Sequence, residues 1–168
     1  MEEIRKFLKG KSVAIVGNAK SIFETKHGKD IDRHDVVIRF NKGFITAPED
    51  QGTRTDILIL ACELNLDEKS SFKAKYYVNR SSKTTCGDYT ISNEYRAGLK
   101  KIIGKQPSSG YMAINLCLEC GCKVHLYGFD WGKTPTYYNP EGYVTRHDYD
   151  KEEELVQELI KRGKVEKD

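Results

Sequence analysis

The arrangement of short apolar runs along the chain restricts its fold more than any other feature. Runs of five or six residues, rich in Val, Ile and Leu and bounded by turn residues, are typical of parallel strands buried on both faces. The sequence predicts such strands over residues 12–16, 35–40, 56–61, 75–79 and 123–127. Segments with helical spacing lie at residues 91–103, 109–120 and 150–161. Alternating strands and helices predict a mostly parallel α/β sheet.

No linker, internal repeat or change of composition divides the 168 residues. We therefore expect a single Rossmann-like domain over residues 1–168, built as three α/β/α layers. Tyr95, Leu99 and Ile102 are predicted to share one face of their helix. Residues 164–168 are expected to fray.

Charge and cysteine content limit the classes of protein to consider. The net charge of +3 argues against the large cationic surface of a non-specific DNA-binding protein. The first nine residues are too charged for a signal peptide, and no apolar run approaches the length that spans a membrane. Five cysteines, an odd number, favour reduced thiols. A cytoplasmic location is expected, and the cluster over residues 117–122 is interpreted as core packing rather than a metal site.

Polar residues follow the first two predicted strands. Gly17 and Asn18 come directly after the first strand, and Asn41 follows the second. Open parallel sheets bind ligands at this edge, where glycine permits close backbone approach and asparagine offers a donor and an acceptor. Two uncharged amides could hold a phosphate or a sugar without a metal. The alternative is a pair of ordinary caps at strand ends.

The segment Pro107-Ser108-Ser109-Gly110 opens a predicted helix. Free N–H groups and the helix dipole favour an anion at such a position. Plain N-capping by Ser108 or Ser109 is the alternative.

His147 stands apart from the other three histidines. It follows a long loop over residues 128–149 and precedes an acidic helix, so Asp148, Asp150 or Glu152 could orient its ring and raise its basicity. The alternative is an exposed surface histidine. By contrast, His125 is expected to be structural, and His27 and His34 to be solvated.

The strand ends, the helix start and His147 follow one another along the chain in an order that resembles the sialyltransferases of glycosyltransferase family 29, which use CMP-sialic acid. The long motif of that family is similar to residues 13–18, 28–41 and 52–55, and its short motif to residues 107–110 through 124–129. Its last motif, a histidine with a glutamate five positions on, matches His147 and Glu152. The resemblance spans residues 12–155 and points to a minimal microbial or viral member.

The resemblance implies the GT-A-like variant of the α/β fold and an inverting, metal-independent transfer. No cofactor is implied beyond the CMP-sugar co-substrate. Asn18 and Asn41 would contact the phosphate and ribose region. Ser109 and Gly110 would hold the nucleotide or the donor carboxylate. His147 would be the general base, with Glu152 as structural support. The other donor-binding residues implied are Gly17, Ser108, Tyr127, Gly128, Phe129, Trp131, Tyr137 and Tyr138, among which Gly128 and Phe129 would line the cytidine site.

Three departures from the family pattern accompany the resemblance. The third motif aligns with Thr136-Tyr137-Tyr138 and lacks its histidine, so Tyr137 or Tyr138 would donate to the phosphate instead. Val13 stands where the animal enzymes have a disulfide-forming cysteine. The stretch between the long and short motifs is also shorter, which reduces the acceptor-binding region.

The expected partners are a nucleotide-sugar donor and a glycan or other hydroxyl acceptor, with nucleic acid as a further candidate acceptor. Three alternatives stay open at this point: a phage-type DNA base glycosyltransferase, a nucleotide or nucleotide-sugar hydrolase, and a nucleotide-binding module without catalysis. The loop over residues 128–149 is predicted to act as a lid over the donor.

Overall fold

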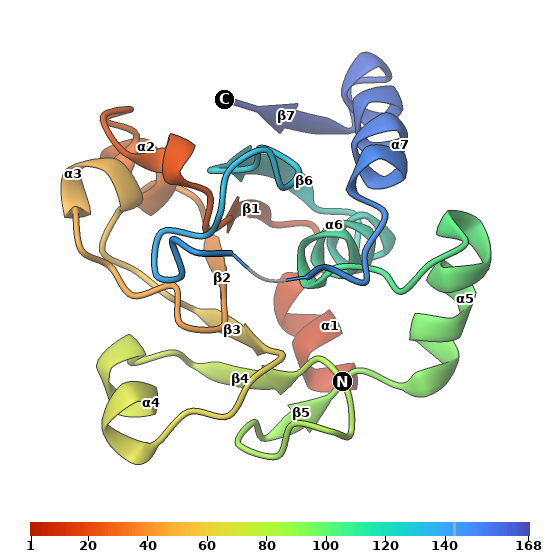
Figure 1. Cartoon of the computed structure of the whole chain (residues 1–168), viewed down its shortest axis with the longest axis horizontal. Helices are drawn as coiled ribbons and strands as arrows, with labels where there is room; N and C mark the ends of the chain where they lie inside the picture. The colour runs from red at the N-terminus through yellow and green to blue at the C-terminus, as the bar shows by residue number, and fades with distance from the viewer. Residues whose placement is uncertain (143) are drawn as a thin grey trace.

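The predicted apolar runs form the central strands of a seven-stranded parallel sheet (Figure 1). The computed structural model describes residues 1–142 and 144–168. The strands are β1 (Ser12–Val16), β2 (Val36–Phe40), β3 (Ile57–Leu60), β4 (Tyr76–Asn79), β5 (Tyr89–Thr90), β6 (Lys123–Tyr127) and β7 (Val165–Lys167). Their order is β5-β4-β3-β2-β1-β6-β7, and neighbouring strands pair in parallel. The predicted α/β class is confirmed.

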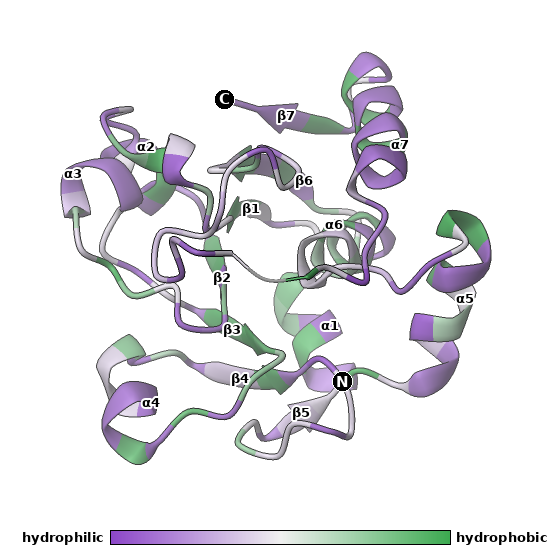
Figure 2. Cartoon of the chain, viewed as in Figure 1, coloured by the Kyte–Doolittle hydropathy of each residue, from purple (hydrophilic) through white to green (hydrophobic). Residues whose placement is uncertain are grey.

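Helices cover both faces of this sheet. They are α1 (Glu2–Leu8), α2 (Gly28–Asp32), α3 (Pro48–Gln51), α4 (Leu66–Phe72), α5 (Asn93–Ile103), α6 (Ser109–Glu119) and α7 (Tyr149–Lys161), with the 3₁₀ turn η1 (Lys20–Ile22). Met112 of α6 and Val156 of α7 pack in one buried cluster with Val13, whereas Ile31 of α2 packs with Ala14 in another. Figure 2 shows α7 as mostly hydrophilic with hydrophobic bands, as expected for a covering helix.

Both edges of the sheet extend beyond the prediction. Residues 164–168 do not fray, because Val165 pairs with Val124 of β6 and is only 2% exposed. At the other edge, β5 adds two residues beside β4. On α5, Leu99 and Ile103 are buried while Ile102 is 57% exposed, so the predicted face was wrong by about one position.

Arg39 is a buried cation inside β2. It is 1% exposed, and its guanidinium donates to the carbonyls of Gln51 at 2.6 Å and Arg54 at 2.9 Å and to the hydroxyl of Thr55 at 3.2 Å. Burial lowers the pKa of Arg39 to about 10, well above physiological pH, so it remains charged. The side chain fastens the loop after α3 to the sheet.

Candidate active site at the carboxyl edge of the sheet

A cleft of about 740 Å³ opens at the carboxyl ends of the parallel strands. The strand order reverses between β1 and β6, and ligands of open α/β sheets bind outside such a switch point. The first residues after β1, β2, β3, β4 and β6 all line the cleft, together with the N-terminus of α6 and parts of the loop before α7.

Most residues predicted for the site meet in this cleft. Those that line it are Gly17, Asn18, Asn41, Ser108, Ser109, Gly110, Gly128, Phe129, Trp131, Tyr138 and His147. Tyr127 does not, because its ring lies on the α2 side of the sheet, stacked on His125 at a centroid distance of 4.4 Å. Tyr137 also lies outside, since its hydroxyl donates to the Phe44 carbonyl at 2.9 Å and its ring packs on Phe23.

The loops after β1 and β6 press against each other at Gly17. The Gly17 N–H donates to the Tyr127 carbonyl at 2.7 Å, and the Ala19 N–H to the Gly128 carbonyl at 3.2 Å. A β-carbon on Gly17 would lie 2.4 Å from the Gly128 oxygen and 3.0 Å from the Phe129 ring. Only glycine permits this contact, which sets the floor of the cleft.

Gly17→Ala should therefore lower the free energy of unfolding by about 1–3 kcal/mol, since the two loops must separate. Gly98→Ala is the matched control, because its β-carbon would meet no atom within 4 Å on α5. That control should stabilise the helix by about 0.5–1 kcal/mol. Thermal unfolding measures both variants. A Gly17→Ala protein as stable as the parent would contradict the close packing of the two loops.

Asn18 and Asn41 act as strand-end caps and also line the cleft. The Asn18 amide Nδ2 donates to the Phe40 carbonyl at 3.0 Å and to the Tyr138 hydroxyl at 3.4 Å. Asn41 has a φ of 51°, and its Oδ1 accepts from the Ala61 N–H at 2.7 Å. Because this oxygen is engaged, the Nδ2 group is what Asn41 can donate to a ligand. The predicted strand-end contacts are thus confirmed, whereas the binding of a phosphate or a sugar by these two residues stays a prediction.

The N-terminus of α6 faces the same cleft. Ser108 is the N-cap, and its Oγ accepts from the Tyr111 N–H at 3.1 Å, as predicted. Ser109 and Gly110 form the first turn, whose free N–H groups favour an anion. A β-carbon on Gly110 would lie 2.7 Å from the Phe129 ring, so this glycine lets the aromatic side chain reach the helix.

Glu152 is a carboxyl group buried beneath this helix start. It is 0% exposed, with Oε1 accepting from the Ser108 N–H at 2.7 Å and Oε2 from the Ser108 hydroxyl at 2.6 Å. Burial raises the pKa of Glu152 to about 7, although the Ser108 hydrogen bonds and the Arg80 charge oppose the rise. Its structural role in fixing the α6 N-terminus fits the role that the resemblance implied.

A backbone carbonyl orients His147, rather than any of the carboxylates that the sequence suggested. Nδ1 lies 2.8 Å from the Gln106 oxygen, so it carries a proton and donates it. Asp148 instead caps α7, through the Lys151 N–H at 3.2 Å. With the proton on Nδ1, the other nitrogen, Nε2, has a free electron pair.

The surroundings of His147 keep its ring neutral. Burial lowers the pKa of His147, and the Arg80 charge lowers it further, while the Gln106 carbonyl partly opposes both. A neutral imidazole with a fixed tautomer is the form that a general base requires. The lowered pKa and the fixed tautomer are compatible with the role of a general base, which stays a prediction.

Arg80 is a cleft residue that sequence reasoning missed. It directly follows β4 and lines the cleft, and its Nη2 donates to the Pro107 carbonyl at 2.7 Å. Consecutive residues thus hold three side chains: Gln106 holds His147, Pro107 holds Arg80, and Ser108 holds Glu152. The position after a buried strand, which singled out Asn18 and Asn41, could also have indicated Arg80.

The loop over residues 128–149 is tied to the segment after β1 at residues 136 and 137. Thr136 forms a bridge with Ala19, and the Tyr137 N–H donates to the Asn18 carbonyl at 3.0 Å. The Asn139 N–H donates to the Thr136 carbonyl, closing a turn. One residue of the predicted lid, Tyr143, lies outside the described residues. These contacts anchor residues 136 and 137, and the role of the loop as a lid stays a prediction.

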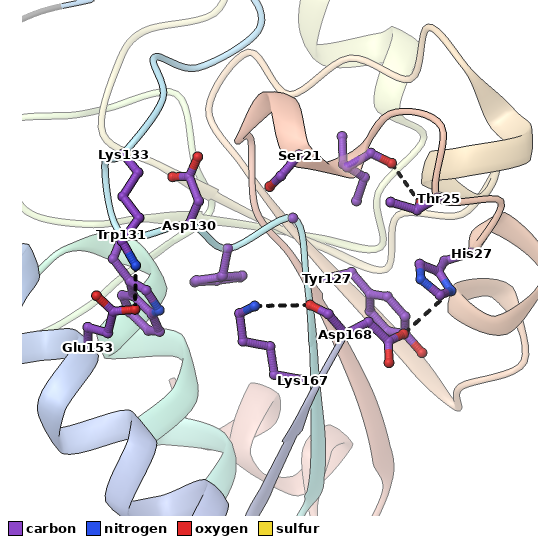
Figure 3. A pocket seen from close by; sticks show the side chains of 13 residues that line it. Ser21, Thr25, His27, Tyr127, Asp130, Trp131, Lys133, Glu153, Lys167 and Asp168 are labelled. Carbon is purple, nitrogen blue, oxygen red and sulfur yellow. Dashed lines mark hydrogen bonds and ion pairs between the residues drawn. The ribbon is translucent and has the colours of Figure 1, made fainter.

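A second, smaller cavity of about 240 Å³ lies behind the loop that follows β6 (Figure 3). Tyr127, His27 and Asp168 line one end, and Trp131, Lys133 and Glu153 line the other. The prediction that His27 and His34 are solvated was wrong, since both rings are half-buried at 5.8 Å from the Tyr127 ring.

The described residues contain neither a cluster of metal-binding side chains nor a helix that could cross a membrane. No group of three or more His, Cys, Asp or Glu side chains there is arranged to hold a metal ion. Within the same residues, every helix is too short or too polar to cross a membrane.

Comparisons with known proteins agree with one another. The family model of glycosyltransferase family 29 (sialyltransferase) matches residues 5–86 and 88–164. The β-galactoside α-2,6-sialyltransferase 1 of Homo sapiens is 39% identical over 66 residues, which are 38% of this chain and only 16% of that relative.

Solved structures share the fold across nearly the whole chain. A mammalian sialyltransferase in complex with Gal-β-1-3GalNAc-ortho-nitrophenol has a TM-score of 0.71 at 19% identity, covering 98% of this chain and 71% of that one. The sialyltransferase CstII from Campylobacter jejuni, in complex with the substrate analogue CMP-3FNeuAc, has a TM-score of 0.61 at 12% identity, covering 94% and 80%. These likenesses confirm the expected GT-A-like α/β fold.

Proposed function

Because the chain belongs to glycosyltransferase family 29, we propose that it transfers sialic acid or a related acidic sugar from a CMP-activated donor to a hydroxyl acceptor. The observation that carries this proposal is the neutral His147, held through Nδ1 by Gln106 inside a cleft that also contains an anion-binding helix start. This arrangement supplies a base and a phosphate site within one cavity.

The donor lies across the switch point between β1 and β6. Gly128 and Phe129 flank the cytidine, while Asn18, Asn41 and the first turn of α6 hold the phosphate. Tyr138 takes the place of the missing histidine, since its hydroxyl lies 3.4 Å from the Asn18 amide and lines the cleft. Tyr137 is excluded from that role by its hydrogen bond to Phe44.

The reaction proceeds by a single displacement. The acceptor hydroxyl gives its proton to Nε2 of His147 as its oxygen bonds to the anomeric carbon. The bond from that carbon to the phosphate oxygen breaks on the opposite side, so the configuration inverts and CMP leaves. The amides and the α6 N-terminus stabilise the negative charge that develops on the phosphate.

Calorimetric titration with CMP, UMP, AMP and GMP in EDTA tests this function first. We expect selective CMP binding that does not need a metal. Asn18→Asp should weaken it by about tenfold to a hundredfold, because the variant places a negative charge beside the phosphate. Asn93→Asp, the same change on exposed α5, should bind CMP like the parent. Selectivity for another nucleotide, or dependence on a metal, would refute the proposed donor.

Hydrolysis stays as the second candidate function, because the acceptor region between the motifs is short. Donor turnover in the absence of any acceptor would identify it. A nucleic-acid acceptor has no support from the described cleft, where Lys42 is already paired with Glu68 at 2.8 Å.

A further inference from the structure

The smaller cavity behind the loop after β6 is a space of its own (Figure 3). It measures about 240 Å³, and its lining comes from the carboxyl ends of β6 and β7, the segment around η1 and one residue of α7. Residues 128–131 line both this cavity and the cleft, so they form a wall between the two. At about 30 Å³ per water molecule, the cavity has room for about eight waters or one small organic molecule.

The indole of Trp131 is an unsatisfied donor in this wall. Trp131 is only 8% exposed, and no described residue accepts a hydrogen bond from its Nε1–H. Its φ of 58° lies in the left-handed region, which costs free energy for a residue with a side chain. Buried N–H groups in folded proteins nearly always have an acceptor, and strained residues gather at ligand sites. Both features indicate that a ligand supplies the missing acceptor.

The charged groups at the two ends of the cavity are engaged with one another, which argues for a neutral ligand. At one end Lys133 pairs with Glu153 at 2.8 Å, and at the other His27 lies 3.5 Å from Asp168 (Figure 3). The ammonium of Lys167 donates to the backbone carbonyl of Asp168 at 3.0 Å. A bound ion would have to separate one of these pairs and leave a charge without its partner.

The remaining lining suits a molecule that combines an apolar face with hydroxyl groups. Tyr127, Phe129 and Trp131 contribute aromatic rings, and Ser21 and Thr25 contribute hydroxyls. The C–H face of a saccharide packs on aromatic rings, while its hydroxyls both donate and accept hydrogen bonds. One hydroxyl oxygen can accept from the Trp131 N–H, and the paired carboxylates keep lone pairs that can accept from the other hydroxyls.

We propose that this cavity is an accessory site for one neutral monosaccharide unit, which accepts a hydrogen bond from the indole N–H of Trp131. The site lies beyond the proposed function, because the unit occupies a space other than the donor cleft and takes no part in the transfer. A glycan held there by one unit stays close to the cleft, which begins on the other side of residues 128–131. The site therefore favours substrates that carry a neutral sugar.

Trp131 is the single tryptophan of the chain, so its indole N–H gives one NMR resonance that reports directly on the site. Galactose, glucose and N-acetylglucosamine are titrated into the ¹⁵N-labelled protein, with galacturonic and glucuronic acid as charged counterparts. We expect at least one neutral sugar to shift this resonance with a Kd of about 1–10 mM, as for a ligand of about twelve to fifteen non-hydrogen atoms. Each acid should bind about tenfold more weakly than its neutral counterpart.

The resonances of other residues locate the bound sugar. The amides of Ser21, Thr25 and Lys167, which line the cavity but not the cleft, should shift together with the indole. Those of Asn41 and Gly110, which line only the cleft, should stay in place. The same shifts should appear when the protein is loaded with CMP, because the nucleotide occupies the other side of the wall.

Two variants test the cavity and the indole separately. Ser21→Phe should abolish binding because the added ring fills the cavity, whereas Ser70→Phe, the same change on exposed α4, is the matched control and should bind like the parent. Trp131→Phe keeps an aromatic ring without the N–H. It should weaken binding about threefold to tenfold, measured on the resonances of the sugar.

Several results would overturn the proposal. The absence of any shift with the neutral sugars, at concentrations well above the expected Kd, would show that the cavity binds none of them. Shifts confined to cleft residues, or displacement of the sugar by CMP, would place the sugar in the cleft. Tighter binding of the acids would assign the cavity to an anion, and unchanged binding in both Ser21→Phe and Trp131→Phe would exclude it as the site. If the parent binds no CMP, the proposed donor fails, and the cavity resonances still decide the accessory site.

Discussion

Replacing His147 with glutamine should lower kcat by about 10²–10⁴-fold while leaving CMP binding intact. The imidazole is the group that accepts the acceptor proton, and its Nδ1 is already committed to Gln106. Glutamine can still donate to that carbonyl but offers no basic nitrogen. Initial rates and CMP titration on the same preparation separate the two effects.

The pH profile gives an independent readout of the same residue. Burial lowers the pKa of His147 from its ordinary value of 6.5, so the base stays neutral above this lowered pKa and activity falls only as the pH drops through it. The acid limb of kcat/KM should therefore lie below pH 6.5. His34→Gln, outside the cleft, is the control and should keep both rate and profile. A His147→Gln protein that retains the parental rate would indicate that a different group acts as the base.

Removing the buried carboxyl of Glu152 should have the largest effect on stability. Glu152→Ala leaves the Ser108 N–H without its acceptor and opens a cavity under α6, at a cost of about 2–4 kcal/mol. Glu152→Gln keeps the shape and one acceptor, so its cost should be smaller.

The pH dependence of stability distinguishes the charge of Glu152 from its packing. The pKa of about 7 in the folded state exceeds the ordinary 4.5, so the protonated form is favoured by folding. The resulting stabilisation is complete below pH 4.5 and disappears as the pH rises through 7, amounting to about 3 kcal/mol. Urea unfolding at several pH values should show this loss in the parent and a flatter curve in Glu152→Gln.

Glu153→Gln is the matched control. The Glu153 carboxylate, next to Glu152 in the sequence, is partly exposed and paired with Lys133. It should keep the parental pH dependence. Identical slopes for Glu152→Gln and the parent would mean that Glu152 ionises normally in the folded protein.

The sequence predicted the centre of the fold better than its edges. A strand covered on both faces, such as β1 or β3, must be apolar at nearly every position, which makes it visible as a run. An edge strand pairs on one side only, so β7 can carry the polar Glu166 and Lys167 and looks like a tail. On α5 the burial of Ile103 instead of Ile102 depends on the angle at which the helix docks.

The site was predictable where it follows from strand ends and the helix start, as with Asn18, Asn41 and Ser108. Two other features depend on tertiary contacts that leave no local pattern. The group that orients His147 is the backbone carbonyl of Gln106, which any residue type would supply. The displacement of Tyr127 and Tyr137 from the cleft follows from the direction of their side chains. The cytoplasmic location and the independence from metals stay predictions.

The contacts that anchor residues 136 and 137 have a thermodynamic consequence for the loop that contains them. Ordering a backbone costs about 1–2 kcal/mol of conformational entropy per residue, so a lid of this length that folded only around its ligand would cancel the gain from binding a nucleotide. Here the bridge between Ala19 and Thr136 and the bond from Tyr137 to Asn18 form part of the folded state itself. The conformational entropy of that part is lost when the protein folds. Binding of a donor therefore does not have to order this part, and the contacts with the donor add to the affinity without that cost.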